Sequence, residues 1–256
     1  MLTNLLLPFD QHFDDGFHAV GHAFKESADR LATSGEENFT YSNSHLPVNY
    51  LYRHSIELFL KSAILTIHRA LQLPNGDGTE SKYPPVKDGP KWRLFKNTHC
   101  VTLLLNEVDR LVSGNEPAFA SKDADHWSIP DELRILIQVI EKYDKSSTFS
   151  RYGDSGNQHD EFKADFVRVD PAKLNVPDVS SSGGLTYILL NDENVAAQAF
   201  ELQTDPLPEF RLALVKAAEM LSSASFELDA DLVRGRSTLA KAIASNTITA
   251  SPNESG

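Results

Sequence analysis

The segment Leu46–Leu71 constrains the fold of this 256-residue chain more than any other. Its apolar residues surround much of a helix instead of forming one stripe; they are Leu51, Ile56, Leu58, Phe59, Leu60, Ala63, Ile64 and Ile67. A helix of this kind must be covered on several sides by other elements. Pro47 suits a first helical turn, where a missing N–H loses no hydrogen bond. The pattern therefore predicts a long helix at the centre of a helical domain.

Other segments carry apolar residues at spacings of three and four, which place them on one face of a helix. These segments are Phe9–Leu31, Val101–Val112, Pro130–Tyr143 and Pro208–Phe226, with a further helical segment expected at Asp229–Ala244. We therefore expect a mostly α fold in which one domain spans residues 1–244.

Three segments lack the helical spacing of apolar residues. Glu161–Val169 alternates apolar and polar residues and Gly184–Asn191 is rich in strand formers, which predicts a small two-stranded β insert at about 161–191. Pro74–Pro90 holds several glycines and prolines, and we expect a surface loop there. Residues 245–256 are polar and lack a core face, so we expect a disordered tail.

Composition limits the classes of partner. The net charge of −12 argues against general adhesion to nucleic acid or to anionic membranes, but it leaves room for a local basic site. Cys100 is the only cysteine, so an intramolecular disulfide is excluded and a reducing compartment is favoured. The sequence has no signal-peptide pattern and no apolar run of about 20 residues. These features predict a cytoplasmic protein with no membrane partner.

Three segments resemble the signature of the HEPN family. The central helix carries Arg53-His-Ser-Ile-Glu57-Leu-Phe-Leu-Lys61-Ser-Ala63, which is similar to a Glu-Leu-x-x-Lys-Ala core. His99-Cys-Val-Thr-Leu103-Leu is similar to a Gly-His-Asp-Leu helix start, and Ser150-Arg151-Tyr152-Gly153-Asp154 to a Ser-Arg-Tyr-Pro-Asp segment. The resemblance covers about residues 10–154, with Pro208–Phe226 as a closing helix.

The resemblance implies an antiparallel bundle of four to five helices that forms a homodimer. Many HEPN domains are metal-independent endoribonucleases, and others accompany a nucleotidyltransferase. Active members carry Arg-x(4 to 6)-His near the start of the last core helix, and this chain has no such pair there. The spacing occurs only at Arg93–His99, before the third helix, whereas Arg151 and His159 are too far apart. We therefore expect a HEPN-like binding or assembly protein whose partner is RNA or another protein. The resemblance also implies a role in a prokaryotic defence or toxin system. The alternative is a metal-independent endoribonuclease that cleaves RNA by Arg/His acid–base chemistry.

The candidate catalytic residues are Arg53, His54, Glu57 and His99. The first three lie within about one helical turn and can face one polar seam, which His99 reaches from the next helix start. An arginine there can hold a phosphate while a histidine transfers a proton near neutral pH. Arg151 is expected at the mouth of this seam. The alternative interpretation is structural: Glu57 and Lys61 form an ion pair inside the bundle, and His99 is a buried residue behind an N-terminal cap from Thr98.

A second candidate site combines cations with aromatic residues: Lys91, Trp92, Arg93 and Lys96, to which Arg151 is added as a further RNA-binding residue. Single-stranded nucleic acid needs this combination, because cations contact phosphates and rings stack on bases. The alternative is a solvated loop anchored by Trp92 and Phe95.

His18 and His22 lie four residues apart, the spacing at which two histidines on one helix can bind a metal ion. Ala19 stands where a metalloprotease helix would carry glutamate, and there is no glycine-rich phosphate loop. The sequence therefore predicts neither a metal nor a cofactor.

Overall fold

The computed structural model describes residues 8–34, 45–75, 82–122, 124, 127–144, 166–173, 186–202 and 207–233. Helices account for 66% of these residues, in six α-helices, which confirms the mostly α prediction. Arg151, residues 234–244 of the segment Asp229–Ala244, and the expected tail at 245–256 lie outside the described residues. Within the described ranges, no helix is both long and apolar enough to span a bilayer.

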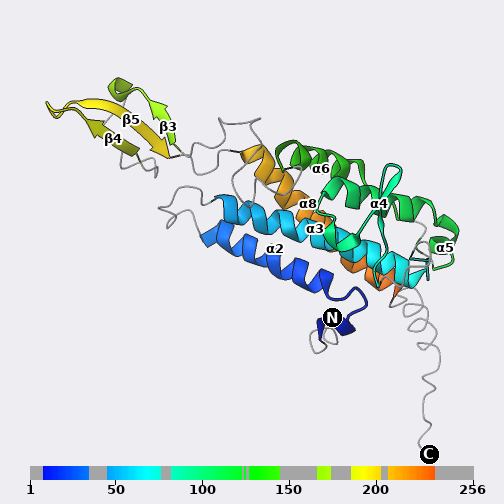
Figure 1. Cartoon of the computed structure of the whole chain (residues 1–256). Helices are drawn as coiled ribbons and strands as arrows, with labels where there is room; N and C mark the ends of the chain where they lie inside the picture. Colours follow the sequence, from blue (N-terminus) through cyan, green and yellow to red (C-terminus); the bar gives the residue numbers. More distant parts are fainter. Residues whose placement is uncertain are drawn as a thin grey trace, which may run out of the picture.

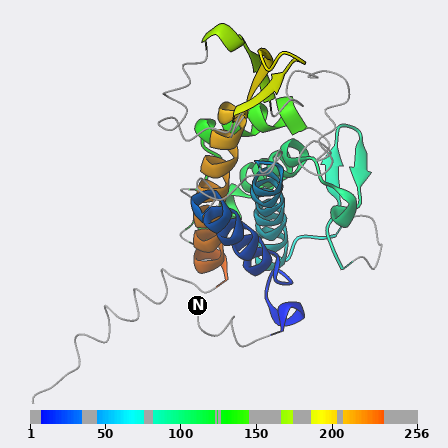
Figure 2. The same cartoon turned by 90° about the vertical axis from the view of Figure 1, so that its left-hand side faces the viewer.

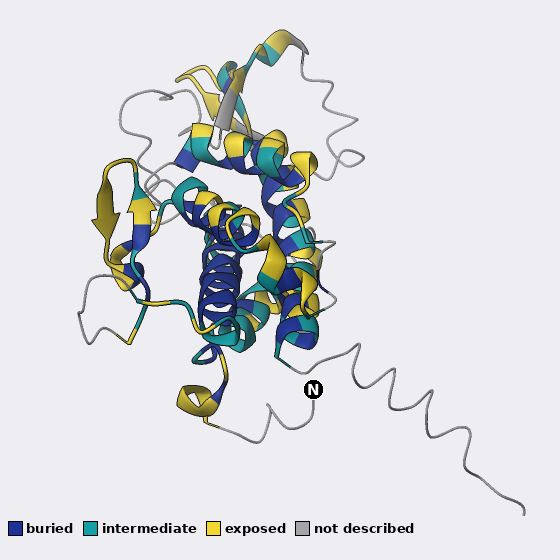
Figure 3. Cartoon of the chain, turned by 90° about the vertical axis from the view of Figure 1, so that its right-hand side faces the viewer, coloured by how far each residue is buried: buried dark blue, intermediate teal, exposed yellow. Residues whose placement is uncertain are grey.

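Helix α3, His45–Ala70, is the centre of the bundle (Figure 1). Helices α2 (Phe17–Ser34), α4 (Val101–Ser113) and α8 (Pro208–Leu232) contact it directly, and α6 (Asp131–Asp144) packs against α8 and α4. Almost every residue from Tyr52 to His68 is buried, as the dark blue helix in Figure 3 shows. The central helix predicted from all-round hydrophobicity is confirmed, and its polar residues must find partners inside the protein.

Helices α2 and α3 approach each other closely at Gly21. A Cβ atom added at Gly21 would lie 3.1 Å from the ring of Phe59 and 3.2 Å from Leu58. Glycine at this position therefore lets α2 lie directly on the central helix.

The directions of the helices follow from the polar contacts between their ends. Asp14 before α2 accepts a hydrogen bond from Ser62 late in α3, so α2 and α3 run antiparallel. Arg211 at the start of α8 bonds Asn49 at the start of α3, so these two neighbours run parallel. Arg53, in the first half of α3, likewise bonds the backbone of His99 just before α4. His68 near the end of α3 and Leu111 near the end of α4 line one common pocket, so α3 and α4 also run parallel.

The predicted antiparallel arrangement is therefore wrong for part of the bundle, because α3, α4 and α8 share one direction. The cause is the long connection after α3. It returns the chain along α3 to the level of Arg53 before α4 begins.

Part of the connection predicted as a loop is a hairpin. Strands β1 (Val86–Asp88) and β2 (Lys91–Arg93) pair antiparallel around Gly89, whose φ of +58° suits glycine. Figure 2 shows this hairpin at the side of the bundle, next to α4. The hairpin is followed by the short 3₁₀ helix η2 (Phe95–Asn97), and Phe95 is buried in the core. A short helix, α5 (Glu116–Ala120), was also missed by the sequence analysis.

The predicted insert contains a sheet, but with three strands instead of two. Strands β3 (Phe166–Val169), β4 (Thr186–Leu190) and β5 (Ala196–Leu202) have the order β3-β5-β4, and both pairings are antiparallel. The unpredicted strand β5 lies between the two predicted ones. It joins β4 through a turn in which Asn194 has a φ of 59°. The sheet lies beyond one end of the helical bundle (Figure 1).

Candidate functional site

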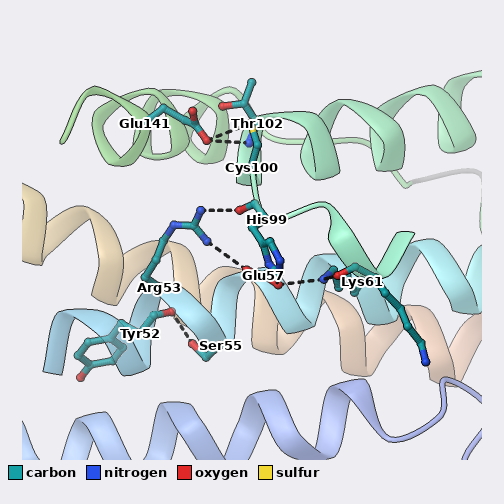
Figure 4. A network of polar contacts seen from close by, with 10 residues as sticks. Tyr52, Arg53, Ser55, Glu57, Lys61, His99, Cys100, Thr102 and Glu141 are labelled. Atoms are coloured by element: carbon teal, nitrogen blue, oxygen red, sulfur yellow. Dashed lines mark hydrogen bonds and ion pairs between the residues drawn. The ribbon is translucent and has the colours of Figure 1, made fainter. Parts of the chain in front are cut away.

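Three of the predicted catalytic residues, Arg53, Glu57 and His99, form a polar cluster together with Lys61, between α3 and the start of α4 (Figure 4). Glu57 is at the centre. Its Oε1 accepts hydrogen bonds from Lys61 Nζ at 2.9 Å and lies 3.0 Å from His99 Nδ1. Its Oε2 lies 3.8 Å from Arg53 Nη1. The ion pair predicted from the spacing of Glu57 and Lys61 is confirmed.

Burial differs sharply within this cluster. The side chain of Arg53 is 0% exposed and that of Glu57 is 2% exposed, whereas that of His99 is 45% exposed. Arg53 donates a 2.6 Å hydrogen bond to the backbone carbonyl of His99, and so ties α3 to the segment that begins α4. The Arg53 guanidinium is therefore used inside the protein and is not open to a phosphate from solvent.

The electrostatics of Glu57 follow from these neighbours. Burial by itself raises the pKa of a carboxyl group, but Lys61, Arg53 and His99 together outweigh that effect, and the pKa of Glu57 lies below its usual value. The carboxylate is thus charged at neutral pH. It holds the half-exposed ring of His99 through Nδ1, the arrangement by which a carboxylate orients a histidine for proton transfer.

His54 does not join this cluster. Its ring stacks on Tyr50 at 5.7 Å and meets Phe24 of α2 edge-on at 4.6 Å, so it faces α2. Successive residues on a helix are separated by about 100° of rotation. The predicted seam, which required His54 beside Arg53 and His99, is wrong for His54, whereas Arg53, Glu57 and His99 do converge.

The predicted cap of α4 is also different. Cys100 occupies the N-cap position without a side-chain hydrogen bond, and the Thr98 hydroxyl instead donates to the carbonyl of Leu94. Glu141 of α6 accepts a hydrogen bond from the backbone N–H of Thr102, at 3.3 Å. A carboxylate from another helix thus supplies the negative charge that favours a helix start.

The four predicted RNA-binding residues of the hairpin region lie together on β2 and η2. Lys91, Trp92, Arg93 and Lys96 are all exposed, and Trp92 is 56% exposed. Arg93 bonds Asp88 across the hairpin. Lys96 Nζ lies 4.7 Å from the ring centre of Tyr83, which stacks on Phe95 at 5.4 Å. This short segment therefore carries both exposed cations and an exposed ring.

His18, His22 and the nearby Asp14 have contacts within the protein. His18 Nδ1 bonds Ser225 of α8 at 2.9 Å, and His22 lies 3.7 Å from Glu26. Both carboxylate oxygens of Asp14 accept backbone N–H groups at the start of α2. No group of three potential ligands suited to a metal ion occurs among the residues that the structure describes.

Sequence reasoning missed a second polar group, formed by His68, Glu107 and Arg110 beside Trp92. Glu107 is buried and accepts two hydrogen bonds from the Arg110 guanidinium, at 2.5 and 3.1 Å. It also accepts the backbone N–H of Lys87, which attaches the hairpin to α4. The spacing of three residues between Glu107 and Arg110 could have predicted their ion pair. The contact between Glu107 and the hairpin could not be predicted, because it joins segments 20 residues apart.

No protein-family model, no curated protein and no solved structure matches this chain. Function is therefore inferred from the geometry of the chain's own residues.

Proposed function

We propose that this chain is a HEPN-like helical binding protein that holds single-stranded RNA on the β1–β2 hairpin and does not cleave it. The observation that carries the proposal is the contrast between two groups of cations. Arg53 and Lys61 are buried against Glu57, whereas Lys91 and Lys96 are exposed on the same hairpin segment as the exposed Trp92. The resemblance to HEPN proteins extends the proposal to an assembly subunit of a prokaryotic defence or toxin system.

The chemistry of the hairpin supports this assignment. Exposed lysines attract phosphates, and an exposed indole ring supplies a surface on which any base can stack. Lys87, Lys91 and Lys96 form no salt bridge with the described carboxylates, so their ammonium groups are available to phosphates. A net charge of −12 disfavours general adhesion of RNA to the molecule, so binding would depend on local cations such as these.

Binding is measured by the fluorescence anisotropy of a short labelled single-stranded RNA over a range of salt concentrations. Lys96→Glu should weaken binding, and removing one phosphate contact should reduce the slope of log K against log salt by about 0.7. Trp92→Ala should weaken binding about 5- to 150-fold, the usual range for loss of one stacked base.

Lys142→Glu is the matched control. Lys142 is exposed on α6 and lies 4.8 Å from the ring of Tyr143, almost the same geometry as Lys96 over Tyr83. Both variants change the net charge by the same amount, so a specific surface predicts a loss for Lys96→Glu alone. Equal affinities for the two variants would contradict the proposal.

A second candidate, the metal-independent endoribonuclease, is favoured by one observation, the His99–Glu57 pair. The half-exposed imidazole bound to a buried carboxylate has the geometry of a general acid or base. The same RNA, followed on a denaturing gel, separates the two functions. Intact RNA supports the binding protein, whereas cleavage that is lost in His99→Ala would assign the enzyme.

A further inference from the structure

Lys87 and Trp92 lie directly opposite each other in the β1–β2 hairpin. Opposed residues of an antiparallel pair point to the same face of the sheet, with Cβ atoms about 4.5–5.5 Å apart. Successive residues of a strand alternate between faces, so Lys91 and Arg93 point to the other face. Lys87, which the sequence analysis did not include among the RNA-binding residues, is therefore the hairpin lysine that shares a face with the exposed ring of Trp92.

Arg110 of α4 lies against the same ring. Helix α4 is next to the hairpin (Figure 2), and the Arg110 guanidinium carbon lies over the Trp92 ring, 5.7 Å from its centre. A guanidinium in this position is attracted to the face of the indole and so favours one orientation of the ring. Trp92 remains 56% exposed, so the ring still presents surface on which a base can stack.

Glu107 connects both neighbours of Trp92. Its side chain is 0% exposed, and it accepts hydrogen bonds from Nε and Nη2 of Arg110, at 3.1 and 2.5 Å. It also accepts the backbone N–H of Lys87, at 3.2 Å. One buried carboxylate therefore holds both the strand that carries Lys87 and the guanidinium over Trp92. Such prior ordering lowers the entropy that is lost when a ligand binds.

The two cations beside the ring are suited to different roles. Glu107 balances the charge of Arg110, which makes Arg110 a support for the ring. Lys87 is exposed and forms no salt bridge with a carboxylate in the part of the chain that the structure describes. Its ammonium group is therefore the one suited to a phosphate next to a base on Trp92.

We propose that Lys87, Trp92 and Arg110 form a site for one nucleotide of single-stranded RNA. The base stacks on the exposed surface of Trp92, Lys87 contacts an adjoining phosphate, and Arg110 is a positioning residue that orients the ring. Lys91, on the other face of the hairpin, does not contact this nucleotide. The inference rests on the proposed function, because it assigns residues to the RNA-binding surface of the hairpin.

Lys87→Met and Lys91→Met are a matched pair of variants, because each removes one exposed lysine charge from the same hairpin. Binding of a short labelled single-stranded RNA is measured by fluorescence anisotropy over a range of salt concentrations. Lys87→Met should weaken binding and reduce the slope of log K against log salt by about 0.7, the effect of losing one phosphate contact. Lys91→Met should leave the slope unchanged.

Arg110 is tested through its dependence on Trp92. Arg110→Met should weaken binding about two- to fivefold, which corresponds to one exposed cation–π contact, and should leave the salt slope unchanged. In the Trp92→Ala background the same substitution should have no further effect, because no ring is left to orient. If Arg110→Met lowers the melting temperature, the double variant Glu107→Gln/Arg110→Met repeats the test without leaving a buried charge unpaired.

Stacking is followed directly by fluorescence. Trp127→Phe leaves Trp92 as the only tryptophan of the chain. Addition of RNA to this variant should quench the fluorescence, and the same strand with abasic positions should not. Equal quenching by both strands would show that no base stacks on Trp92 and would overturn the site.

The outcomes separate the inference from the proposed function. If the wild type binds no RNA, both are overturned. If RNA binds but Lys87→Met and Lys91→Met change the salt slope equally, RNA binding by the hairpin stands and the assignment of Lys87 is overturned. An effect of Arg110→Met that persists in the Trp92→Ala background overturns its positioning role. A reduced slope for Lys87→Met alone, with base-dependent quenching of Trp92, supports the site.

Discussion

Replacing Glu57 with glutamine leaves Arg53 and Lys61 as buried cations without a neutralising carboxylate. Their side chains are at most 4% exposed, so water cannot take over the role of Glu57. Breaking a buried ion pair by removing one partner costs about 3–5 kcal/mol. In a domain of this size about 1 kcal/mol shifts the melting temperature by about 2–4 °C, so we expect a fall of roughly 6–20 °C.

Glu26→Gln is the matched control for this experiment. Glu26 and Arg30 have the same spacing in a helix and the same 3.8 Å separation as Arg53 and Glu57, but their side chains are 53% and 83% exposed. A surface substitution of this kind changes the free energy of unfolding by no more than about 0.5 kcal/mol. Differential scanning calorimetry of both variants compares the loss of a buried carboxylate with the loss of an exposed one.

The pH dependence gives an independent check on the same residue. The pKa of Glu57 in the folded protein lies below the ordinary value of 4.5, so its stabilising contribution is present above that value. As the pH falls further, the folded carboxylate must be protonated and this contribution is lost. Wild type should therefore lose stability more steeply than Glu57→Gln below about pH 4.5.

A second substitution tests the cause. Lys61→Met in the Glu57→Gln background removes one of the two uncompensated cations, so part of the lost stability should return. If Glu57→Gln melts within 1–2 °C of wild type, or the double variant melts lower than the single one, the argument from buried charge is refuted.

Four further outcomes are expected. Leu58→Ala on the central helix should lower the free energy of unfolding by about 2–5 kcal/mol in a urea titration, because the side chain is buried in the core. Burial raises the pKa of Asp15, but Arg69 and Lys82 outweigh that effect and lower it to about 2. Ionised Asp15 should therefore stabilise the fold above pH 3.8, and this contribution should be lost as the pH falls toward 2. Melting temperatures of Asp15→Asn should not show this decline. Because the pKa of His68 is lowered in the folded protein, the unfolded chain takes up a proton at this residue first as the pH falls through 6.5, and the wild type loses stability. In urea titrations, His68→Phe should show a smaller loss of stability over the same pH range. We also expect a homodimer, as the HEPN resemblance implies, and a monomer mass in light scattering at all concentrations would contradict it.

Much of the helical framework could be predicted because helix formation depends on local spacing. The apolar periodicity located α3, α4 and α6 to within one or two residues, since residues three and four apart share a face wherever the helix lies. The same local geometry predicted the Glu57–Lys61 ion pair. The clustering of cations around Trp92 could also be predicted, because those residues are neighbours in the sequence.

Contacts between segments far apart in the sequence could not be predicted from local spacing. The β1–β2 hairpin lies in a segment rich in glycine and proline, and its position on α4 depends on the bond from Lys87 to Glu107, 20 residues away. Strand β5 pairs with β3 across more than 25 residues of chain. Such pairings depend on which surfaces meet, and local periodicity does not contain that information.

The sequence by itself determined that a long helix, apolar around much of its circumference, would lie at the centre, and that its buried polar residues would need internal partners. Only the tertiary structure decided which partner each one found. Arg53 and His54 are adjacent in the chain, yet the rotation of the helix turns Arg53 toward His99 and His54 toward Phe24. Which of two neighbouring side chains joins a site depends on the packing of α2 and α4 around α3, and that packing is a property of the folded chain as a whole.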